Sequence, residues 1–461
     1  IKTNAGILHH NMKWLSDNEG KEKKKAFLKS VWTAAVADLY AERMIPSELR
    51  WSYPGAFSPF DKLQYQQMYN ELANIPVEGK NVTVSDTPST EAEAVCNYAL
   101  TNVSLDANNL MLGIDVGGST SDALVLAMDR AERAFKLCKQ SSMRLAAGMF
   151  INVITRSSEF RNAVYKFHES PACKFKVANI KNITENPETA PFYLNAILDR
   201  LKEGEFEAFY RAMSQSCPQI FAVPAYITGL LLFYSGKLAA KTIKENNYNS
   251  ISIVDLLPFG KGGRLFDWLD VYPGKSMTAD YYNKCFCAGM GNSQPIKLIK
   301  KDSIRKDNKS EVSKGLSAPQ KVKASDNIKS ASDLIGEVGY KFYPAGSNAA
   351  QELQPNDVAE SKYLEEMDFG IEIPTTFPEF EKFLQIFAQF AGPNSTGILP
   401  NVSKITQNNL ARELKAYIIN DIEWQKADNL KRQGQPFEYK HSLLVLEGMC
   451  FLENFLIPEI K

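Results

Sequence analysis

The spacing of apolar side chains predicts helices and strands in alternation at the beginning of the chain. Residues 25–45 repeat apolar side chains at helical intervals, so we expect a helix whose apolar face packs on the core. That face would carry Phe27, Val31, Ala34 or Ala35, and Leu39. The following runs predict a strand at 49–53, a helix at 58–73, a short strand at 82–84 and a helix that begins near Thr87.

Longer apolar patterns predict the elements of the second half. We expect a strand at 251–257, a short helix within 309–316, and helices at 220–243, 376–391, 409–431 and 442–457. Phenylalanines line one side of the helix at 376–391, which is typical of a core face: Phe377, Phe380, Phe383, Phe387 and Phe390. Thr376 and Glu379 have the spacing of a capping box at its start, and Gly392-Pro393 predicts its end.

Residues 110–126 combine two apolar strands with a polar turn. The two runs predict a β-hairpin with Gly117 and Gly118 at its bend, flanked by Asp115, Asp122 and hydroxyl side chains at 119–121. Glycines let backbone N–H groups approach a phosphate, hydroxyls add donors, and carboxylates hold Mg²⁺ or its waters. The pattern favours a phosphate site, and a tight turn capped by Asp and Ser is the alternative interpretation.

A second glycine-rich segment follows the strand at 251–257. Residues 258–264 read Pro-Phe-Gly-Lys-Gly-Gly-Arg and lead into an apolar helical stretch. A strand, a glycine-rich loop and a helix N-terminus in this order can form a cradle for an anion or a nucleotide. Similar turns are common in α/β proteins, so this loop supports the hairpin but indicates little by itself.

Charge and composition exclude several classes of protein. The 461 residues include 53 basic and 53 acidic side chains, so no strong mean field attracts nucleic acid or an anionic membrane. Apolar runs are shorter than the about 20 residues that a membrane helix needs. Seven scattered cysteines predict thiols in a reducing, cytoplasmic compartment, and four histidines argue against a histidine-based zinc site. We expect a globular protein with no nucleic-acid and no membrane partner.

The order of these segments resembles the actin-like ATPase superfamily, which includes actin, sugar kinases and the seventy-kilodalton heat-shock chaperones. Residues 114–122, Ile-Asp-Val-Gly-Gly-Ser-Thr-Ser-Asp, resemble its second phosphate motif. Residues 49–54 resemble a strand and turn of the chaperone ATPase domain, 87–100 its connecting helix, 259–264 its adenosine motif and 311–315 the helix that returns after it. The resemblance covers roughly residues 45–320 and implies an α/β, ribonuclease H-like fold of two lobes with Mg·ATP between them.

The resemblance also implies roles for individual residues. The β- and γ-phosphates would be held by Gly117, Gly118, Ser119 and Thr120. Asp115 would face the metal through water and serve catalysis, with Asp122 on the metal side, and Glu91, or Glu93 if the helix is shifted, would orient the attacking water. The nucleoside would be bordered by Gly260, Gly262, Gly263 and Arg264. Phosphoryl transfer depends on this kind of positioning and charge neutralisation.

The resemblance further implies how the chain divides. Residues 1–108 would form a partial first lobe with the connecting helix, residues 109–330 the second lobe with both motifs, and residues 331–461 a mainly helical C-terminal region. No Asp-x-Gly hairpin precedes the connecting helix, although the superfamily places its first phosphate motif near the start of the first lobe. We therefore expect an incomplete first lobe, in a piece of a longer protein, with low nucleotide affinity by itself.

Three functions are compatible with these expectations. The first is an ATPase whose nucleotide state sets the angle between the lobes and so controls a protein partner or self-association. The second is a small-molecule kinase for a sugar or an acid on the same fold, with Asp122 available as a general base. The third is a non-catalytic scaffold that retains the fold and uses only its surface.

Overall fold

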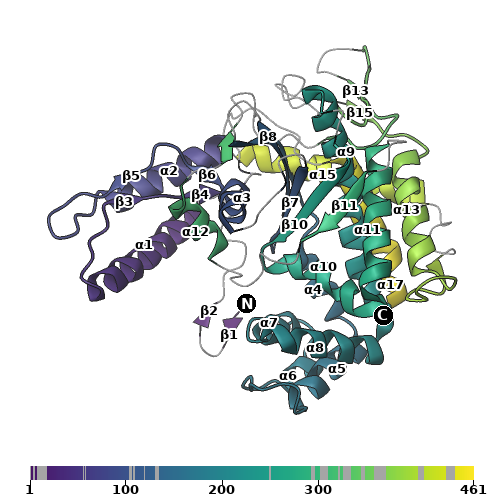
Figure 1. The fold of residues 1–461 in the computed structure, drawn as a ribbon, viewed down its shortest axis with the longest axis horizontal. Helices are drawn as coiled ribbons and strands as arrows, with labels where there is room; N and C mark the ends of the chain where they lie inside the picture. The colour runs from purple at the N-terminus through teal and green to yellow at the C-terminus, as the bar shows by residue number, and fades with distance from the viewer. Residues whose placement is uncertain are drawn as a thin grey trace.

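The computed structural model shows a mixed α/β fold built around a central sheet (Figure 1). It describes residues 2–3, 6–7, 18–54, 57, 59–102, 106, 109–118, 120–129, 134–248, 251–291, 296–301, 310–319, 322–324, 334–343, 348–357, 370–402, 410–431 and 442–460. At the start, β1 (Lys2–Thr3) pairs with β2 (Gly6–Ile7).

The central sheet orders its six described strands as β11-β10-β7-β8-β9-β12. Their bounds are β7 (Leu110–Val116), β8 (Ser121–Asp129), β9 (Ala134–Met143), β10 (Ile253–Phe259), β11 (Lys297–Lys300) and β12 (Val322–Ala324). The first three form an antiparallel meander, whereas β10 runs parallel to β7, β11 to β10, and β12 to β9. The predicted hairpin and the predicted strand before the glycine-rich loop are confirmed; β9 was not predicted.

One face of the sheet is covered by long helices, led by α9 (Ala222–Asn246). This helix packs on α11 (Lys275–Met290) with the two backbones in close contact, because a Cβ at Gly236 would lie 2.2 Å from the Phe286 carbonyl oxygen, and one at Gly289 would lie 1.9 Å from that of Phe233. Of the described helices, the stretch Pro218–Asn246 is long and apolar enough to cross a membrane, and 94% of its most apolar window is buried inside the fold.

The opposite face is covered by α3 (Glu91–Asn102) and α12 (Glu311–Ser317). Alanines, Val95 and Cys96 of α3 form a small core with Leu124, Leu126 and Leu257 of the sheet. Gly315 lets α12 approach α3, because a Cβ there would lie 1.7 Å from the Ala94 carbonyl oxygen. The short helix expected within 309–316 is therefore present, but it is docked on another helix and its Glu311 and Gly315 are buried.

The N-terminal segments project from the sheet as an arm (Figure 1). Its elements are α1 (Asn18–Ala41), α2 (Pro59–Ala73), β3 (Glu48–Leu49) paired with β5 (Thr83–Val84), and β4 (Ser52–Tyr53) paired with β6 (Ser89–Thr90). The predicted core face of the first helix is wrong. Phe27 and Val31 are 52% and 50% exposed. Trp32 and Val36 instead pack on a small hydrophobic cluster of the arm, which consists of Ala73, Val77 and Val82.

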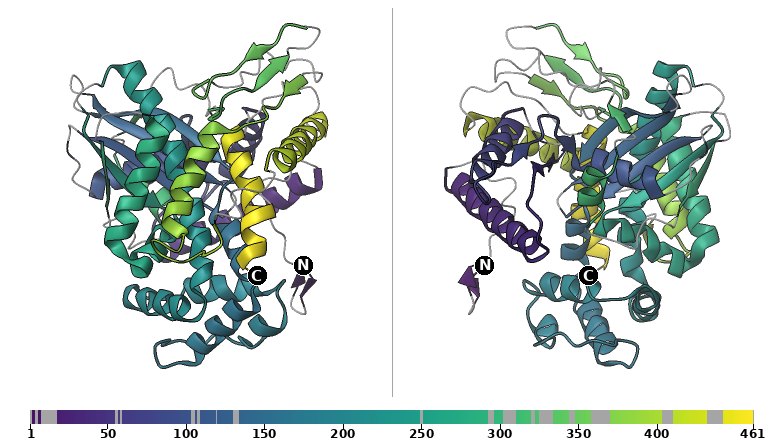
Figure 2. Two further views of the ribbon diagram at one scale, coloured as in Figure 1. Left: turned by 90° about the vertical axis from the view of Figure 1, so that its right-hand side faces the viewer. Right: turned by 60° about the vertical axis from the view of Figure 1, so that its left-hand side comes forward.

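A helical subdomain lies between β9 and β10 in the chain and below the sheet in both figures (Figures 1 and 2). It consists of α4 (Ala147–Ile154), α5 (Ser158–Glu169), α6 (Asn182–Glu185), α7 (Ala190–Leu198), α8 (Glu203–Ser216) and η2 (Pro218–Phe221). Phe209 and Tyr210 of α8 pack on Trp268 with ring centroids 5.9 and 4.7 Å away, which joins this subdomain to the main core.

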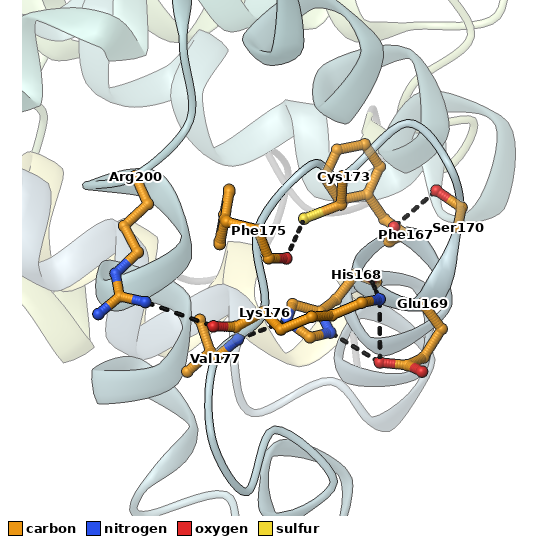
Figure 3. A network of polar contacts seen from close by, with 9 residues as sticks. All are labelled: Phe167, His168, Glu169, Ser170, Cys173, Phe175, Lys176, Val177 and Arg200. Carbon is orange, nitrogen blue, oxygen red and sulfur yellow. Dashed lines mark hydrogen bonds and ion pairs between the residues drawn. The ribbon is translucent and has the colours of Figure 1, made fainter.

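His168 fastens the loop after α5 (Figure 3). The side chain is 1% exposed, its Nε2 accepts the Val177 N–H at 2.8 Å, and its Nδ1 lies 2.8 Å from the Glu169 carboxylate. Because Nε2 accepts, the neutral ring carries its proton on Nδ1 and donates it to Glu169. Lys176 Nζ donates to the His168 carbonyl oxygen at 2.7 Å and closes the network.

The C-terminal helices share one hydrophobic cluster with the sheet and α9. They are α13 (Pro378–Ala391), α15 (Leu410–Lys431), α16 (Leu443–Phe451), the π-helical η7 (Leu452–Leu456) and α17 (Ile457–Ile460). A small sheet, β14 (Gln351–Glu352), β13 (Lys341–Tyr343) and β15 (Gly370–Glu372), lies beside them. The phenylalanines of α13 are all buried, which confirms the predicted core stripe.

The predicted capping box at the start of α13 is wrong. The helix begins after Phe377, and the buried Glu337 carboxylate accepts the N–H groups of Glu379 and Phe380 at 3.2 and 2.9 Å. Glu379 itself pairs with Lys237 of α9. Nearby, Glu447 of α16 is fully buried, accepts the Tyr340 hydroxyl at 2.6 Å, and has its pKa raised well above the ordinary value by burial and by Glu337.

Candidate functional site

The hairpin tip, residues 117–120, and the glycine loop, residues 260–264, lie at the same edge of the sheet. This follows from topology, because β7 and β10 are parallel neighbours and end together, with Asp115 opposite Phe259. The carboxyl ends of β7 and β10 meet at this edge, and ligands of open α/β sheets usually bind outside the carboxyl ends of the strands.

The glycine loop contacts the end of β7 closely. A Cβ on Gly260 would lie 2.3 Å from Asp115 Oδ1 and 2.9 Å from the Val116 carbonyl oxygen, and one on Gly262 would lie 2.5 Å from that same oxygen. Gly260 also has φ of 66° and ψ of 172°, a region that is essentially restricted to glycine. Gly260 is thus required here by both contact and conformation, and Gly262 by contact. The loop continues through η3 (Lys261–Arg264) into α10 (Leu265–Leu269) and the π-helical η4 (Asp270–Gly274).

The hairpin tip is tightly turned and accessible. Gly117 N donates to the Thr120 carbonyl oxygen at 2.9 Å, and Ala147 N of α4 donates to the Gly117 carbonyl oxygen at 3.0 Å. Gly118 is exposed, and a Cβ placed there would meet no atom within 4 Å. Ser119 lies outside the described residues. The tip is therefore fixed from behind by α4 and open at Gly118, where a phosphate could approach the backbone.

Polar side chains form a row across three strands just inside the tip. Asp115 lies opposite Asp122, and Asp122 lies opposite Ser142, so the three share the face that α3 covers; we call them the polar row. Asp115 is half-buried, whereas Asp122 and Ser142 are buried. Carboxylates directly opposite each other repel, which favours a cation or a hydrogen-bond donor between them.

Glu91 and Glu93, the two acids predicted to orient the attacking water, have different surroundings at the start of α3. Glu93 accepts the Thr90 N–H at 2.7 Å while its own N–H donates to Thr90 Oγ1 at 3.0 Å, which is a capping box. Glu91 lies beside α2, where its charge contributes to raising the pKa of Tyr65 and Tyr69, whose burial is the larger cause. Glu93 is thus used in folding, and the catalytic role predicted for Glu91 stays a prediction.

The cations of the glycine loop contact the helical subdomain. Arg264 Nη1 donates to the Leu198 carbonyl oxygen at 3.1 Å, and its guanidinium carbon lies 3.6 Å from the centroid of the Phe206 ring. Desolvation lowers the pKa of Arg264. Lys261 pairs with Asp199. The nucleoside contact predicted for Arg264 stays a prediction, because the contacts of its guanidinium in this structure are with the helical subdomain.

Glu311 is a site residue that the sequence did not reveal. Its buried carboxylate accepts the Gly260 N–H at 3.2 Å, so α12, which lies on the same face of the sheet as α3, holds the start of the glycine loop. The chain separates the two residues by 51 positions, and the resemblance placed the helix here without assigning a contact. The only local signal was an acid one turn before a glycine.

The described part of the chain contains no cluster of three or more His, Cys, Asp or Glu side chains arranged as a metal cage. Asp115 and Asp122 nevertheless suit Mg²⁺, which usually keeps several waters and takes one or two carboxylates together with substrate phosphates. The structure thus brings together Asp115, Asp122, Gly117, Gly118, Thr120, Gly260 and Gly262. A comparison with known protein families and with curated proteins finds no match for the chain.

Proposed function

We propose that this chain is an actin-like or chaperone-like ATPase that binds Mg·ATP where the hairpin tip meets the glycine loop. The observation that carries the proposal is the contact of Gly260 with Asp115 and Val116, which joins two glycine-rich segments that lie 140 to 147 residues apart in the chain at one accessible edge. Two glycine turns beside paired carboxylates are the chemistry that a metal-bound polyphosphate requires.

Each part of the site would contribute a separate interaction. Backbone N–H groups around Gly118 and the Thr120 hydroxyl would bind phosphate oxygens, and the carboxylates of Asp115 and Asp122 would bind the waters of Mg²⁺. The metal, when bound, neutralises charge that develops on the transferred phosphoryl group. Gly260 and Gly262 would keep the loop close enough to border the nucleoside.

Nucleotide state would reach a protein partner through the helices that hold the site. Glu311 ties the glycine loop to α12, and Gly315 ties α12 to α3, which leads back to the arm. A ligand that shifts the loop therefore changes the position of α3 and the arm, provided that it binds the two positions with different affinity. The affinity of a protein partner that binds the arm would then depend on the bound nucleotide.

The experiment is a thermal unfolding series with and without millimolar Mg·ATP on the wild-type chain and on two aspartate variants. Because low affinity is expected, the Mg·ATP concentration is increased stepwise through the millimolar range; ligand at about ten times Kd already stabilises the fold by about 1.4 kcal/mol, so a rise in Tm is expected. Asp115→Ala should remove this rise. Asp129→Ala changes another half-buried aspartate, at the far end of β8, and should retain it.

Product analysis separates the ATPase from the other candidate functions. Release of inorganic phosphate without any added acceptor supports the ATPase, whereas turnover only with a sugar or an acid supports the kinase. A wild-type chain that shows no rise in Tm with Mg·ATP refutes nucleotide binding and leaves the scaffold.

A further inference from the structure

A buried carboxamide lies directly inside the polar row. Gln140 of β9 is 6% exposed and pairs with Leu124, two residues inward from Ser142 on the same strand face. Thr90 Oγ1, at the start of α3, donates to Gln140 Oε1 at 3.4 Å. Gln140 Nε2 is buried and has no hydrogen-bond partner in the part of the chain that the structure describes.

The unmet hydrogen bond does not depend on how the amide is oriented. Exchanging its oxygen and nitrogen would let the amide nitrogen donate to Thr90 and would leave the carbonyl oxygen unmet in the same position. In either orientation a buried polar atom lacks its partner, which costs about 1–3 kcal/mol. A leucine would fill this place among Leu124 and the apolar side chains of α3 without that cost, so the carboxamide indicates something polar that binds there.

The charged side chains around Gln140 indicate what kind of molecule binds to its amide. The neighbours on this face are the carboxylates of Asp115 and Asp122, and Glu93 caps the helix end beside Thr90. An anion would be repelled by these three acids, and a carboxamide gives a cation only one oxygen. A water molecule fits, because it can donate to one group, accept from another, and occupy a small polar gap with about three hydrogen bonds.

We propose that Gln140 is a positioning residue that holds the water molecule which attacks the bound nucleotide. This inference rests on the proposed function. In the reaction the water oxygen forms a bond to the terminal phosphorus, and the bond from that phosphorus to the bridging oxygen breaks, with its electron pair leaving on the diphosphate. One proton of the water remains on the phosphate product and the other passes to solvent. Gln140 orients the water and itself neither gains nor loses a proton.

The test compares Gln140→Leu with wild type in binding, turnover and stability. Removing one oriented hydrogen-bonding group from such a site typically lowers kcat by about a hundredfold. We expect that loss in kcat with unchanged KM and an unchanged rise of Tm with Mg·ATP. The Tm without ligand should stay equal or increase, because an apolar side chain replaces an unmet polar one. A purely structural glutamine would give the opposite, a lower Tm with normal turnover.

Two further variants keep the test decisive. Gln140→Met, which is unbranched and of similar volume, replaces the leucine variant if that one does not fold. Gln219→Leu makes the same chemical change in the helical subdomain, where Gln219 bonds Glu159, and should leave kcat unaltered. Wild-type kcat in the Gln140 variants, or loss of Mg·ATP binding by them, overturns the inference while the proposed function stands. No Mg·ATP binding or no phosphate release by the wild type overturns both.

Discussion

Adding one methyl group to Gly260 tests whether the glycine loop and the hairpin tip form a single unit. The new Cβ would lie 2.3 Å from Asp115 Oδ1 and 2.9 Å from the Val116 carbonyl oxygen. The carboxylate can rotate away, but the carbonyl belongs to the buried end of β7 and cannot. Gly260→Ala must therefore move the loop away from the tip, in addition to the strain that alanine experiences at φ of 66° and ψ of 172°.

Gly274→Ala supplies the matched control. Gly274 also lies in the glycine-only region, with φ of 121° and ψ of 157°, yet a Cβ there meets no atom within 4 Å. Backbone strain costs about 1–3 kcal/mol in both variants. The collision at Gly260 adds about 1–3 kcal/mol, the usual cost of overpacking. The difference between the two variants thus measures the contact between loop and tip.

The assay is urea unfolding of both variants, followed by the rise of Tm with Mg·ATP. We expect Gly260→Ala to lose more unfolding free energy than Gly274→Ala and to lose the response to Mg·ATP, which Gly274→Ala should keep. Equal losses in both variants, with the Mg·ATP response intact in Gly260→Ala, would refute the argument that the loop contact builds the site.

Three further changes test the surrounding structure. Glu447→Gln should stabilise the fold relative to wild type, increasingly as the pH rises above about 4.3, the pKa of a glutamate in an unfolded chain, because the raised pKa of Glu447 in the fold makes wild-type stability fall as the unfolded chain ionises first; unfolding free energies at several pH values check this, and a gain that shrinks with pH contradicts it. His168→Ala should cost about 2–4 kcal/mol in urea unfolding, since it leaves a cavity and the Val177 N–H without its acceptor; a loss below 1 kcal/mol contradicts the role of the network. Gly315→Ala should separate α12 from α3, because its Cβ would lie 1.7 Å from the Ala94 carbonyl oxygen, and should lower both Tm and the response to Mg·ATP; an unchanged Tm would show that the helices are not in contact.

Strong local patterns allowed much of the fold to be predicted. The hairpin, α9 and the phenylalanine stripe of α13 follow from apolar runs or spacing that admit one interpretation. The buried face of the first helix could not be predicted in this way, because two apolar stripes lie one residue apart in α1. Phe27 and Val31 begin one stripe, whereas Trp32 and Val36 belong to the other, and only the position of the partner helix decides which stripe is buried.

Contacts between distant segments account for the rest. Thr376 and Glu379 have the spacing of a capping box, yet Glu337 takes the orphan N–H groups of α13 from 42 and 43 residues away. In the candidate site, Gln140 contacts Thr90 across 50 residues, and no local pattern predicts that contact. The glycines could be predicted from the sequence because a backbone requirement restricts the residue type at a single position. A hydrogen bond between distant side chains requires only that the two residues match each other, which a single sequence does not show.

The glycine loop connects three parts of the molecule because each side of it has a different partner. Asp115 contacts it from the sheet, Glu311 bonds its first N–H from α12, and Lys261 pairs with Asp199 of the helical subdomain. A loop with one anchor could move by itself when a ligand binds. With three anchors, movement must either break a contact or carry α12 or the helical subdomain with it. A ligand bound at this edge would therefore be coupled through these contacts to both α12 and the helical subdomain.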